Sequence, residues 1–357
     1  MQTPLLNCLL AAGAALALGA ADRDPAASAP AAPALTPPLR WVSTGPLVSP
    51  VSDPTHALVS VKDPTVVFDR GRWHIYATTA DTRGRWSMVY LSFADWADAG
   101  AAKPVYLDAA NPGLRGYHCA PQLFYFRPQQ KWYLVYQSQQ PTYSTAEAVD
   151  RPETWSAPAD FFPASPPGTP ALWLDYWVIC DDENAYLFSS GDDGRWYRCQ
   201  TKLADFPRGF SAPVVVMQDP NRFALFEASC VYRLKGTHQY LAIIEAIGPT
   251  GRRYFRGFLA SRLDGAWTPM ARADSWEHPF AGIANVAFEP GTKPWTEDIS
   301  HGELLRDGCD ETMTIDPQHL QFLYQGEDPA KAYAEPRPEY NLLPWRLALL
   351  RLEPARP

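Results

Sequence analysis

The sequence predicts an all-β protein and, more narrowly, a five-bladed β-propeller. Pairs of short apolar or aromatic runs, separated by polar turn residues, recur five times along the chain. One reference residue near the start of each unit shows the spacing. These residues are Asp63, Ala120, Asp175, Glu227 and Gly302, and successive ones lie 57, 55, 52 and 75 residues apart. A unit of about fifty residues made of short strands cannot bury its own faces and must stack on its neighbours, which is typical of propeller blades.

Each unit has the pattern of a strand hairpin. The five stretches are VKDPTVVFDRGRWHIY from Val61, APQLFYFRPQQKWYLVYQ from Ala120, DYWVICDDENAYLFSS from Asp175, FEASCVYRLKGTHQYLAIIEA from Phe226 and GELLRDGCDETMTIDPQHLQFLY from Gly302. Polar clusters between the paired runs, such as Asp69-Arg70-Gly71 and Asp192-Asp193-Gly194, predict hairpin tips. No stretch keeps a 3.6-residue apolar period over several turns, so we expect helix only as single turns at 94–100 and 329–333.

The two ends of the chain differ in composition from its body. Residues 1–21 begin with an apolar run of small residues followed by charge, which predicts a signal peptide and hence a secreted, extracellular protein. Residues 22–38 are mostly Ala and Pro and predict an extended linker. The propeller is expected over residues 39–357. It contains five cysteines. We expect them to be mainly buried free thiols, and the alternative is a single disulfide bridge.

Charge and aromatic content restrict the partners. The formal net charge is −8, which argues against nucleic acid because a phosphate backbone needs a basic face. No apolar run reaches the roughly 18 to 20 residues of a membrane span. Thirteen Trp and seventeen Tyr are compatible with a neutral polysaccharide, since flat rings stack on sugars, although most of these rings are expected in blade cores. We expect a monomer.

Carboxylates are the candidate chemical groups. The sequence has no GxSxG, HExxH, P-loop or GxGxxG pattern, so hydrolysis by serine, zincin chemistry and nucleotide binding have no support. Asp63, Asp175 and Glu227 each stand near the start of a different unit, and the innermost strands of a propeller converge on its axis. Glycosidic bond hydrolysis needs one carboxylic acid and one carboxylate. The alternative for Asp63 is a turn residue before Pro64.

Six motifs, in order, resemble the α-L-arabinofuranosidases of glycoside hydrolase family 62. They are VKDPTVVF, LDYWVICDDENAYLFSSGDDG, FEASCVYRLKG with IIEAIG, RYFRGFLASRLDGAW, EDISHGELLRDGCDETMTIDP and YNLLPWRLALL, and they run from about Trp41 to Leu352. The resemblance implies a five-bladed propeller that removes arabinofuranosyl branches from arabinoxylan and arabinan with inversion at the anomeric carbon.

The resemblance also assigns roles to the three carboxylates. Asp63 matches the general base, Glu227 the general acid, and Asp175 the third carboxylate, which sets the pKa of the acid and holds the sugar. Lys62 beside the base is expected to keep it ionised and to contact substrate. Inversion predicts carboxyl groups roughly 6.5 to 9.5 Å apart on Asp63 and Glu227.

Further site residues follow from the same resemblance. His301 in DISHGE matches a histidine that faces a structural calcium ion on the axis, although a lone histidine is more often a hydrogen-bonded core residue. Tyr340 and Asn341 in YNLLP match residues that contact the polymer; a buried C-terminal strand that closes the ring is the alternative. Where the family has a Trp-Gly-Pro turn, this chain has Ser138 followed by Gln-Gln-Pro141, so Pro141 keeps part of the pocket wall and Ser138 is expected to widen the pocket.

Two other functions remain open at this point. A propeller related to glycoside hydrolase family 43 would use the same three carboxylates to cut xylosides or arabinan. A non-catalytic carbohydrate-binding propeller would have lost turnover with the missing ring, but it would have no need for three mutually repelling acids.

Overall fold

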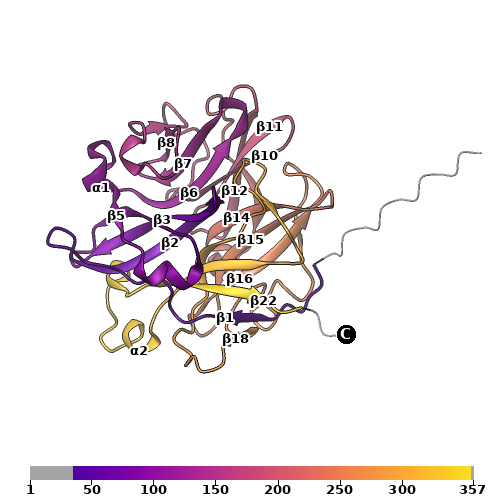
Figure 1. Cartoon of the computed structure of the whole chain (residues 1–357). Helices are drawn as coiled ribbons and strands as arrows, with labels where there is room; N and C mark the ends of the chain where they lie inside the picture. The colour runs from indigo at the N-terminus through magenta and orange to yellow at the C-terminus, as the bar shows by residue number, and fades with distance from the viewer. Residues whose placement is uncertain (1–34, 355–357) are drawn as a thin grey trace, which may run out of the picture. The chain divides into compact units, whose positions relative to one another are not determined.

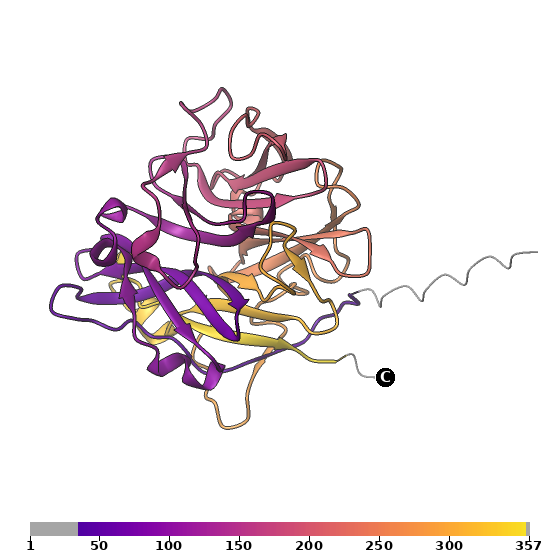
Figure 2. The same cartoon turned by 45° about the horizontal axis from the view of Figure 1, so that its top comes forward.

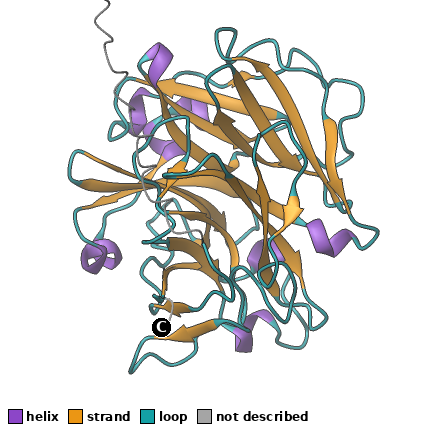
Figure 3. Cartoon of the chain, turned by 90° about the vertical axis from the view of Figure 1, so that its right-hand side faces the viewer, coloured by secondary structure: helices purple, strands orange, loops and turns teal. Residues whose placement is uncertain are grey.

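Five β-sheets are arranged around a central axis, and each forms one blade of a β-propeller (Figure 1). The computed structural model describes residues 35–354. Within that range nearly all regular structure is strand, joined by loops and a few short helices (Figure 3). The expected all-β, five-bladed fold is therefore confirmed. The signal peptide predicted at residues 1–21 and most of the linker predicted at 22–38 lie outside the described residues.

Blades I to III each contain four antiparallel strands that follow one another in the sequence. Blade I consists of β2 (Leu58–Asp69), β3 (Arg72–Asp81), β4 (Trp86–Phe93) and β5 (Val105–Tyr106). Blade II consists of β6 (Cys119–Phe126), β7 (Lys131–Gln137), β8 (Pro141–Ala146) and β9 (Ala159–Asp160). Blade III consists of β10 (Leu174–Cys180), β11 (Asn184–Ser190), β12 (Arg195–Lys202) and β13 (Val214–Gln218).

Blades IV and V borrow strands from distant parts of the chain. Blade IV consists of β14 (Glu227–Leu234), β15 (Tyr240–Ile247), β16 (Arg253–Ala260), β17 (Thr268–Pro269) and β20 (Thr314–Ile315), which pairs in parallel with β14. Blade V has the order β18 (Val286–Phe288), β1 (Trp41–Ser43), β22 (Arg346–Leu352), β21 (Gln321–Gly326) and β19 (Ser300–Leu304). The indigo N-terminal strand β1 therefore lies beside the yellow C-terminal strand β22 (Figures 1 and 2).

Burial explains why the strands nearest the axis are so apolar. Blades stack face to face, so both faces of an inner strand are covered, and such strands carry nearly continuous apolar runs instead of alternating ones. In β6, with the sequence CAPQLFYF, every residue except Tyr125 is buried. The outermost strand of blade III shows the opposite pattern, because Val214 and Val215 of β13 are each 48% exposed.

The innermost strands form a closed ring. β2 contacts β6, β6 contacts β10, β10 contacts β14, β14 contacts β19, and β19 returns to contact β2. These five strands begin within three residues of the units expected from the repeats. The ring brings five segments that are distant in sequence to one hub.

Helices are short, as the sequence indicated. They are η1 (Trp96–Ala101), α1 (Leu107–Ala110), η2 (Pro112–Leu114), η3 (Arg127–Gln129), η4 (Pro152–Thr154), η5 (Arg222–Leu225), α2 (Pro329–Ala332) and η6 (Tyr340–Leu342). The expected turns at 94–100 and 329–333 coincide with η1 and α2, whereas the other six helices of the described residues lie where none was expected. Among the described residues, no helix has the length and apolar character needed to cross a membrane. All five cysteines in the described range are free thiols, and four of them are buried.

Candidate active site

A β-bulge interrupts the inner strand of every blade at the same height. The pairing register shifts between Lys62 and Thr65, Cys119 and Gln122, Leu174 and Trp177, Glu227 and Cys230, and Ser300 and Gly302. In four of these bulges the first extra residue has left-handed backbone angles, namely Asp63 (φ 48°), Ala120 (φ 48°), Asp175 (φ 53°) and Ala228 (φ 52°). That conformation costs roughly 1 to 2 kcal/mol for a residue with a side chain, and bulges often re-aim side chains beside active sites.

The bulges place the candidate carboxylates around the hub. Asp63 and Asp175 occupy equivalent positions in blades I and III. Glu227 stands one residue earlier in blade IV, at the position that Lys62 occupies in blade I, because Ala228 takes the left-handed place. In blade V the extra residue is His301. The repeats predicted that the three acids occupy the same position in their blades. The structure shows this for Asp63 and Asp175, whereas Glu227 lies one residue earlier.

Asp63 is held by cations. Lys62 Nζ lies 2.9 Å from its Oδ2 and His301 Nδ1 lies 3.3 Å from its Oδ1. Its backbone N–H donates to Gln325 Oε1 at 2.6 Å, which ties blade I to blade V. Burial favours the neutral acid, but Lys62 and His301 outweigh burial and hold the pKa of Asp63 below its usual value.

Asp175 lies in the opposite electrostatic setting. Its Oδ2 accepts the N–H of Ala228 at 2.8 Å and lies 3.9 Å from His301 Nδ1. Burial, opposed by His301 and reinforced by the negative charges of Glu227 and Asp63, raises the pKa of Asp175 to about 6. His301 therefore lies between the carboxylates of blades I and III.

Glu227 pairs with an arginine that the sequence reasoning did not single out. Arg253 Nη1 lies 2.5 Å from Glu227 Oε1, and the same nitrogen also bonds Glu245, which faces Glu227 across β14 and β15. Glu245 is fully buried, and burial raises its pKa to about 7 although Arg253 opposes this. The Oε2 atom of Glu245 accepts a hydrogen bond from the backbone N–H of His301 at 2.7 Å. A lone Glu within the apolar run AIIEA was a usable signal, because a buried carboxylate requires a partner.

Aromatic rings surround the Lys62 ammonium group. Its Nζ lies 4.3 Å from the centre of the Trp86 ring and 5.4 Å from that of Tyr340, distances typical of cation–π contacts. Tyr117 stacks against Trp86 with ring centres 5.9 Å apart. Tyr340 is 40% exposed, so these rings border the solvent side of the carboxylates.

Tyr340 and Asn341 lie in η6, immediately before the closing strand. Asn341 Nδ2 donates to the carbonyl oxygen of Gly84 at 3.1 Å. Gly84 has φ 72°, and a Cβ atom there would lie only 2.0 Å from the Asn341 amide, so this approach requires glycine. The buried strand considered as the alternative for these two residues is instead β22, which begins at Arg346.

Pro141 and Ser138 lie at the β7–β8 turn. Pro141 is buried and pairs with Gln137, whose Nε2 donates to the Tyr117 hydroxyl at 2.5 Å. The Ser138 hydroxyl is bonded within the turn to Thr142 Oγ1 at 2.6 Å. Among the described contacts, Pro141 is thus linked to the site through Gln137 and Tyr117 and does not touch the carboxylates.

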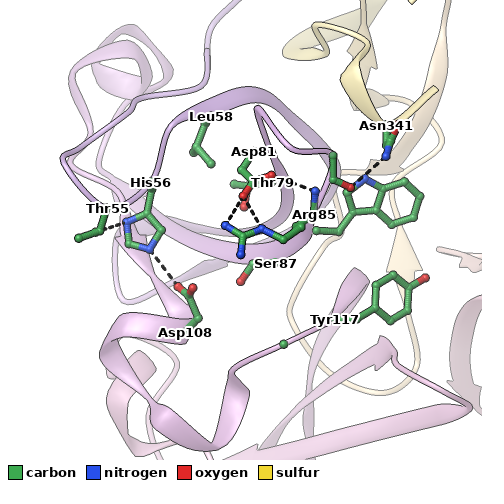
Figure 4. A pocket seen from close by; sticks show the side chains of 13 residues that line it. Thr55, His56, Leu58, Thr79, Asp81, Arg85, Ser87, Asp108, Tyr117 and Asn341 are labelled. Atoms are coloured by element: carbon green, nitrogen blue, oxygen red, sulfur yellow. Dashed lines mark hydrogen bonds and ion pairs between the residues drawn. The ribbon is translucent and has the colours of Figure 1, made fainter. Parts of the chain in front are cut away.

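Two pockets open on either side of the segment 340–341. The blade I pocket has a volume of about 590 Å³ and is drawn in Figure 4. It is lined by Thr55, His56, Leu58, Thr79, Asp81, Gly84, Arg85, Trp86, Ser87, Asp108, Gly116, Tyr117 and Asn341. The blade IV pocket has a volume of about 910 Å³. It is lined by Asn221, Phe223, Ala224, Ile247, Gly248, Pro249, Gly251, Arg253, Tyr254, Trp276, Arg337, Pro338, Tyr340 and Leu343.

The hub itself is narrow. A cavity of about 10 Å³ lies among the inner strands, bordered by residues that include Gln122, Asp175, Ser229 and His301. That volume is close to the minimum for one water molecule. A sugar ring therefore does not fit into this cavity.

The residues at His301 offer few ligands for a metal ion. In the described part of the chain, no group of three His, Cys, Asp or Glu side chains is placed to hold a metal. Calcium takes six to eight oxygen ligands. A calcium ion beside the His301 imidazole would therefore be held mainly by water.

A five-bladed propeller that gathers buried carboxylates and aromatic rings at one hub defines a class of protein, the glycoside hydrolases that work with paired carboxylates. The family model described as glycosyl hydrolase family 62 matches residues 40–351. The chain belongs to glycosyl hydrolase family 62, and the resemblance seen in the six motifs is confirmed.

Individual relatives agree with this membership. The chain is 43% identical over 319 residues to alpha-L-arabinofuranosidase C of Cellvibrio japonicus, covering 88% of this chain and 47% of the relative. It thus spans about half the length of that relative. The catalytic domain of a family 62 α-L-arabinofuranosidase from Coprinopsis cinerea is 47% identical with a TM-score of 0.83, covering 88% of this chain and 97% of that one. A family 62 hydrolase solved in complex with xylotriose is 46% identical with a TM-score of 0.80, covering 87% and 97%.

Proposed function

We propose that this protein is an inverting α-L-arabinofuranosidase that releases arabinofuranosyl branches from arabinoxylan and arabinan. The observation that carries the proposal is the convergence of Asp63, Asp175 and Glu227, from three different blades, around His301 and the hub. Buried carboxylates in such proximity are costly unless they are used or paired. The family match supports the same reaction.

Asp63 serves as the general base in this proposal. Its pKa lies below the usual value because of Lys62 and His301, so the carboxylate stays ionised and can take a proton from the attacking water. Glu227 serves as the general acid and gives a proton to the leaving oxygen. Asp175 interacts electrostatically with both of these carboxyl groups and serves as the third carboxylate.

The closed hub supports the removal of single terminal sugars. Because the cavity below the carboxylates holds about one water molecule, a sugar reaching them has to end there. The polymer main chain would lie outside, across the rings of Trp86 and Tyr340 and toward the pockets on either side. Lys62, Tyr340 and Asn341 are proposed to contact substrate, and Pro141 to support the wall through Tyr117.

The xylotriose bound by a family 62 relative supports a xylan-type polymer as the substrate of this chain. Export from the cell, a monomeric state and a calcium ion beside His301 are further parts of the proposal. Such an ion would stabilise the meeting point of the blades and would take no part in bond cleavage.

Release of arabinose from arabinoxylan tests the proposal. We expect Asp63→Asn and Glu227→Gln to lower kcat by about 10²- to 10⁴-fold, the range of general acid–base catalysis. Glu147→Gln is the matched control, because its side chain is 79% exposed and remote from the hub. NMR of the first product should show the inverted β-anomer.

Different outcomes separate the alternatives. Retention of configuration would contradict the assignment of a base and an acid. Xylose or arabinan fragments as the main products would favour a family 43-like specificity. Absence of turnover in the wild-type protein would indicate a carbohydrate-binding propeller.

A further inference from the structure

The two pockets beside the site differ in charge. Asp81 and Asp108 line the blade I pocket, and each of its cations is already paired. Arg85 Nη2 lies 2.6 Å from Asp81 Oδ2, and the His56 ring lies between Asp53 (2.9 Å) and Asp108 (3.2 Å), as Figure 4 shows for Asp108. An anionic ligand finds no free cation there and meets two carboxylates.

The blade IV pocket has the opposite character. Arg253 and Arg337 are among its lining residues, and no Asp or Glu is. Arg253 is engaged by Glu227 and Glu245, but Arg337 has no ion pair or hydrogen bond through its side chain within residues 35–354. The chain as a whole carries a formal charge of −8, so an exposed, unpaired arginine in a pocket lined by no carboxylate gives this pocket a locally positive character.

Arg337 is held in a defined place by a ring. Its guanidinium carbon lies 4.7 Å from the centre of the Tyr333 ring, whose other neighbour is Arg252 at 3.4 Å. The Tyr333 hydroxyl is fixed by Asp298 at 3.0 Å. A guanidinium on a ring face keeps its N–H edge free, and that edge matches the two oxygens of a carboxylate.

Glu327, a carboxyl group on whose pKa Arg337 acts, does not compensate the charge of Arg337 near neutral pH. Burial, together with the charge of Asp298, raises the pKa of Glu327 to about 8, so this carboxyl group is mainly protonated at pH 6 to 7. Glu335 and Glu339 flank Arg337 in sequence, but neither forms an ion pair with it among the described residues.

Flat apolar surfaces complete the pocket. Tyr254 and Trp276 pack edge to face with centres 5.4 Å apart. Trp276 lies directly on Gly248, where a Cβ atom would come within 2.3 Å of the indole ring. The backbone of Gly248 therefore sets the position of this ring, and rings of this kind are suited to the faces of sugars.

We propose that the blade IV pocket binds a uronic acid branch of the polymer, with Arg337 contacting the carboxylate and Trp276 and Tyr254 bordering the sugar. The inference rests on the proposed function and adds a substrate feature to it. A uronic acid is ionised above about pH 4, as carboxylic acids of this kind are. The pocket volume of about 910 Å³ is sufficient for a branched sugar unit.

Two forms of one polymer test this inference. The first is arabinoxylan that carries glucuronic acid branches, and the second is the same preparation after chemical reduction of its carboxyl groups to alcohols. The measured quantity is the ratio of kcat/KM for arabinose release on the two forms. We expect a ratio of about two to five in favour of the acidic form, the range of a partly exposed ion pair, declining as salt is added.

Arg337→Gln should bring this ratio to about one. Arg233→Gln is the matched control, since Arg233 is exposed near the far end of β14 from Glu227, and it should keep the wild-type ratio. A wild-type ratio of one, or an Arg337→Gln variant that loses activity on both forms equally, would overturn the inference while leaving the arabinofuranosidase proposal intact.

A binding measurement separates failure of the inference from failure of the function. Titration calorimetry with a glucuronic acid-bearing xylo-oligosaccharide and its carboxyl-reduced form needs no turnover. If neither polymer releases arabinose, the proposed function fails, and tighter binding of the acidic oligosaccharide by wild type than by Arg337→Gln would still support the pocket assignment. Equal binding of both forms by the wild-type protein would refute it.

Discussion

Replacing Lys62 by Met tests whether a single ammonium group keeps the proposed base ionised. The Lys62 and Asp63 side chains are 4% and 5% exposed, and Nζ lies 2.9 Å from Oδ2. Met has a similar length but carries no charge, so only His301 and a hydrogen bond from Thr78 would oppose the effect of burial on Asp63. The pKa of Asp63 should therefore rise.

The size of the effect follows from the geometry. At 2.9 Å and an effective dielectric constant of about 20, the attraction is about 6 kcal/mol. Much of it offsets the desolvation of two buried ions. Opposite charges this close typically move a carboxyl pKa by about 1 to 3. The acidic limb of the pH profile should thus move upward by about one to three pH units.

The assay is the pH dependence of kcat/KM for arabinose release, which reports the free enzyme. In the wild-type protein the base stays ionised until the pH falls below its depressed pKa; in Lys62→Met the activity should already fall at a higher pH. If Lys62 also contacts substrate, the loss of that contact lowers kcat/KM at every pH and does not move the acidic limb of the pH profile. Lys235→Met removes an exposed Lys–Asp pair with a 2.6 Å contact and serves as the control. An acidic limb that stays in place in Lys62→Met would refute the reasoning.

Four further outcomes are expected. Glu303→Gln breaks a buried pair with Arg306 at 2.6 Å and should lower the free energy of unfolding in urea by about 3 to 5 kcal/mol; unchanged stability would show that the pair is dispensable. Trp86→Ala should raise KM on arabinoxylan roughly three- to tenfold, because it removes a ring beside Lys62, and an unaltered KM would place the polymer elsewhere. Ser138→Trp should lower KM on the same polymer, and no change would count against the widened pocket. Chelation with EDTA should lower Tm in the wild-type protein but not in His301→Ala; equal responses in differential scanning fluorimetry would argue against calcium at that histidine.

The sequence was sufficient for the number of blades and for the acids at the hub. Repeats near fifty residues define hairpins, and a hairpin in a propeller can only stack on the next. Asp63, Asp175 and Glu227 were visible because each lies at the mouth of an apolar run. The one-residue offset of Glu227 was not, because register depends on bulges whose left-handed residue, here Ala228, carries no distinctive side chain.

Other features depend on contacts between distant segments. β1 and β18 have three residues each and pair in parallel, so neither has a pattern long enough to be recognised. Arg253 of β16 reaches Glu227 of β14 across the strand β15, 26 positions away in the sequence. Trp86 and Tyr117 become neighbours only when blades I and II pack against each other. Periodicity reports what each strand buries, whereas these contacts depend on how blades are rotated against each other.

Contacts that hold Asp63 in place cross the seam between blades V and I. Asp63 meets His301 and Gln325 across that seam, and blade V is complete only when β22, near the end of the described chain, pairs with β1 and β21. A nascent chain that stops before Arg346 already carries every carboxylate proposed for catalysis, but its blade V lacks the strand that joins β1 to β21. We therefore expect blade V, which supplies His301 and Gln325 to Asp63, to be complete only after the last strand has been synthesised.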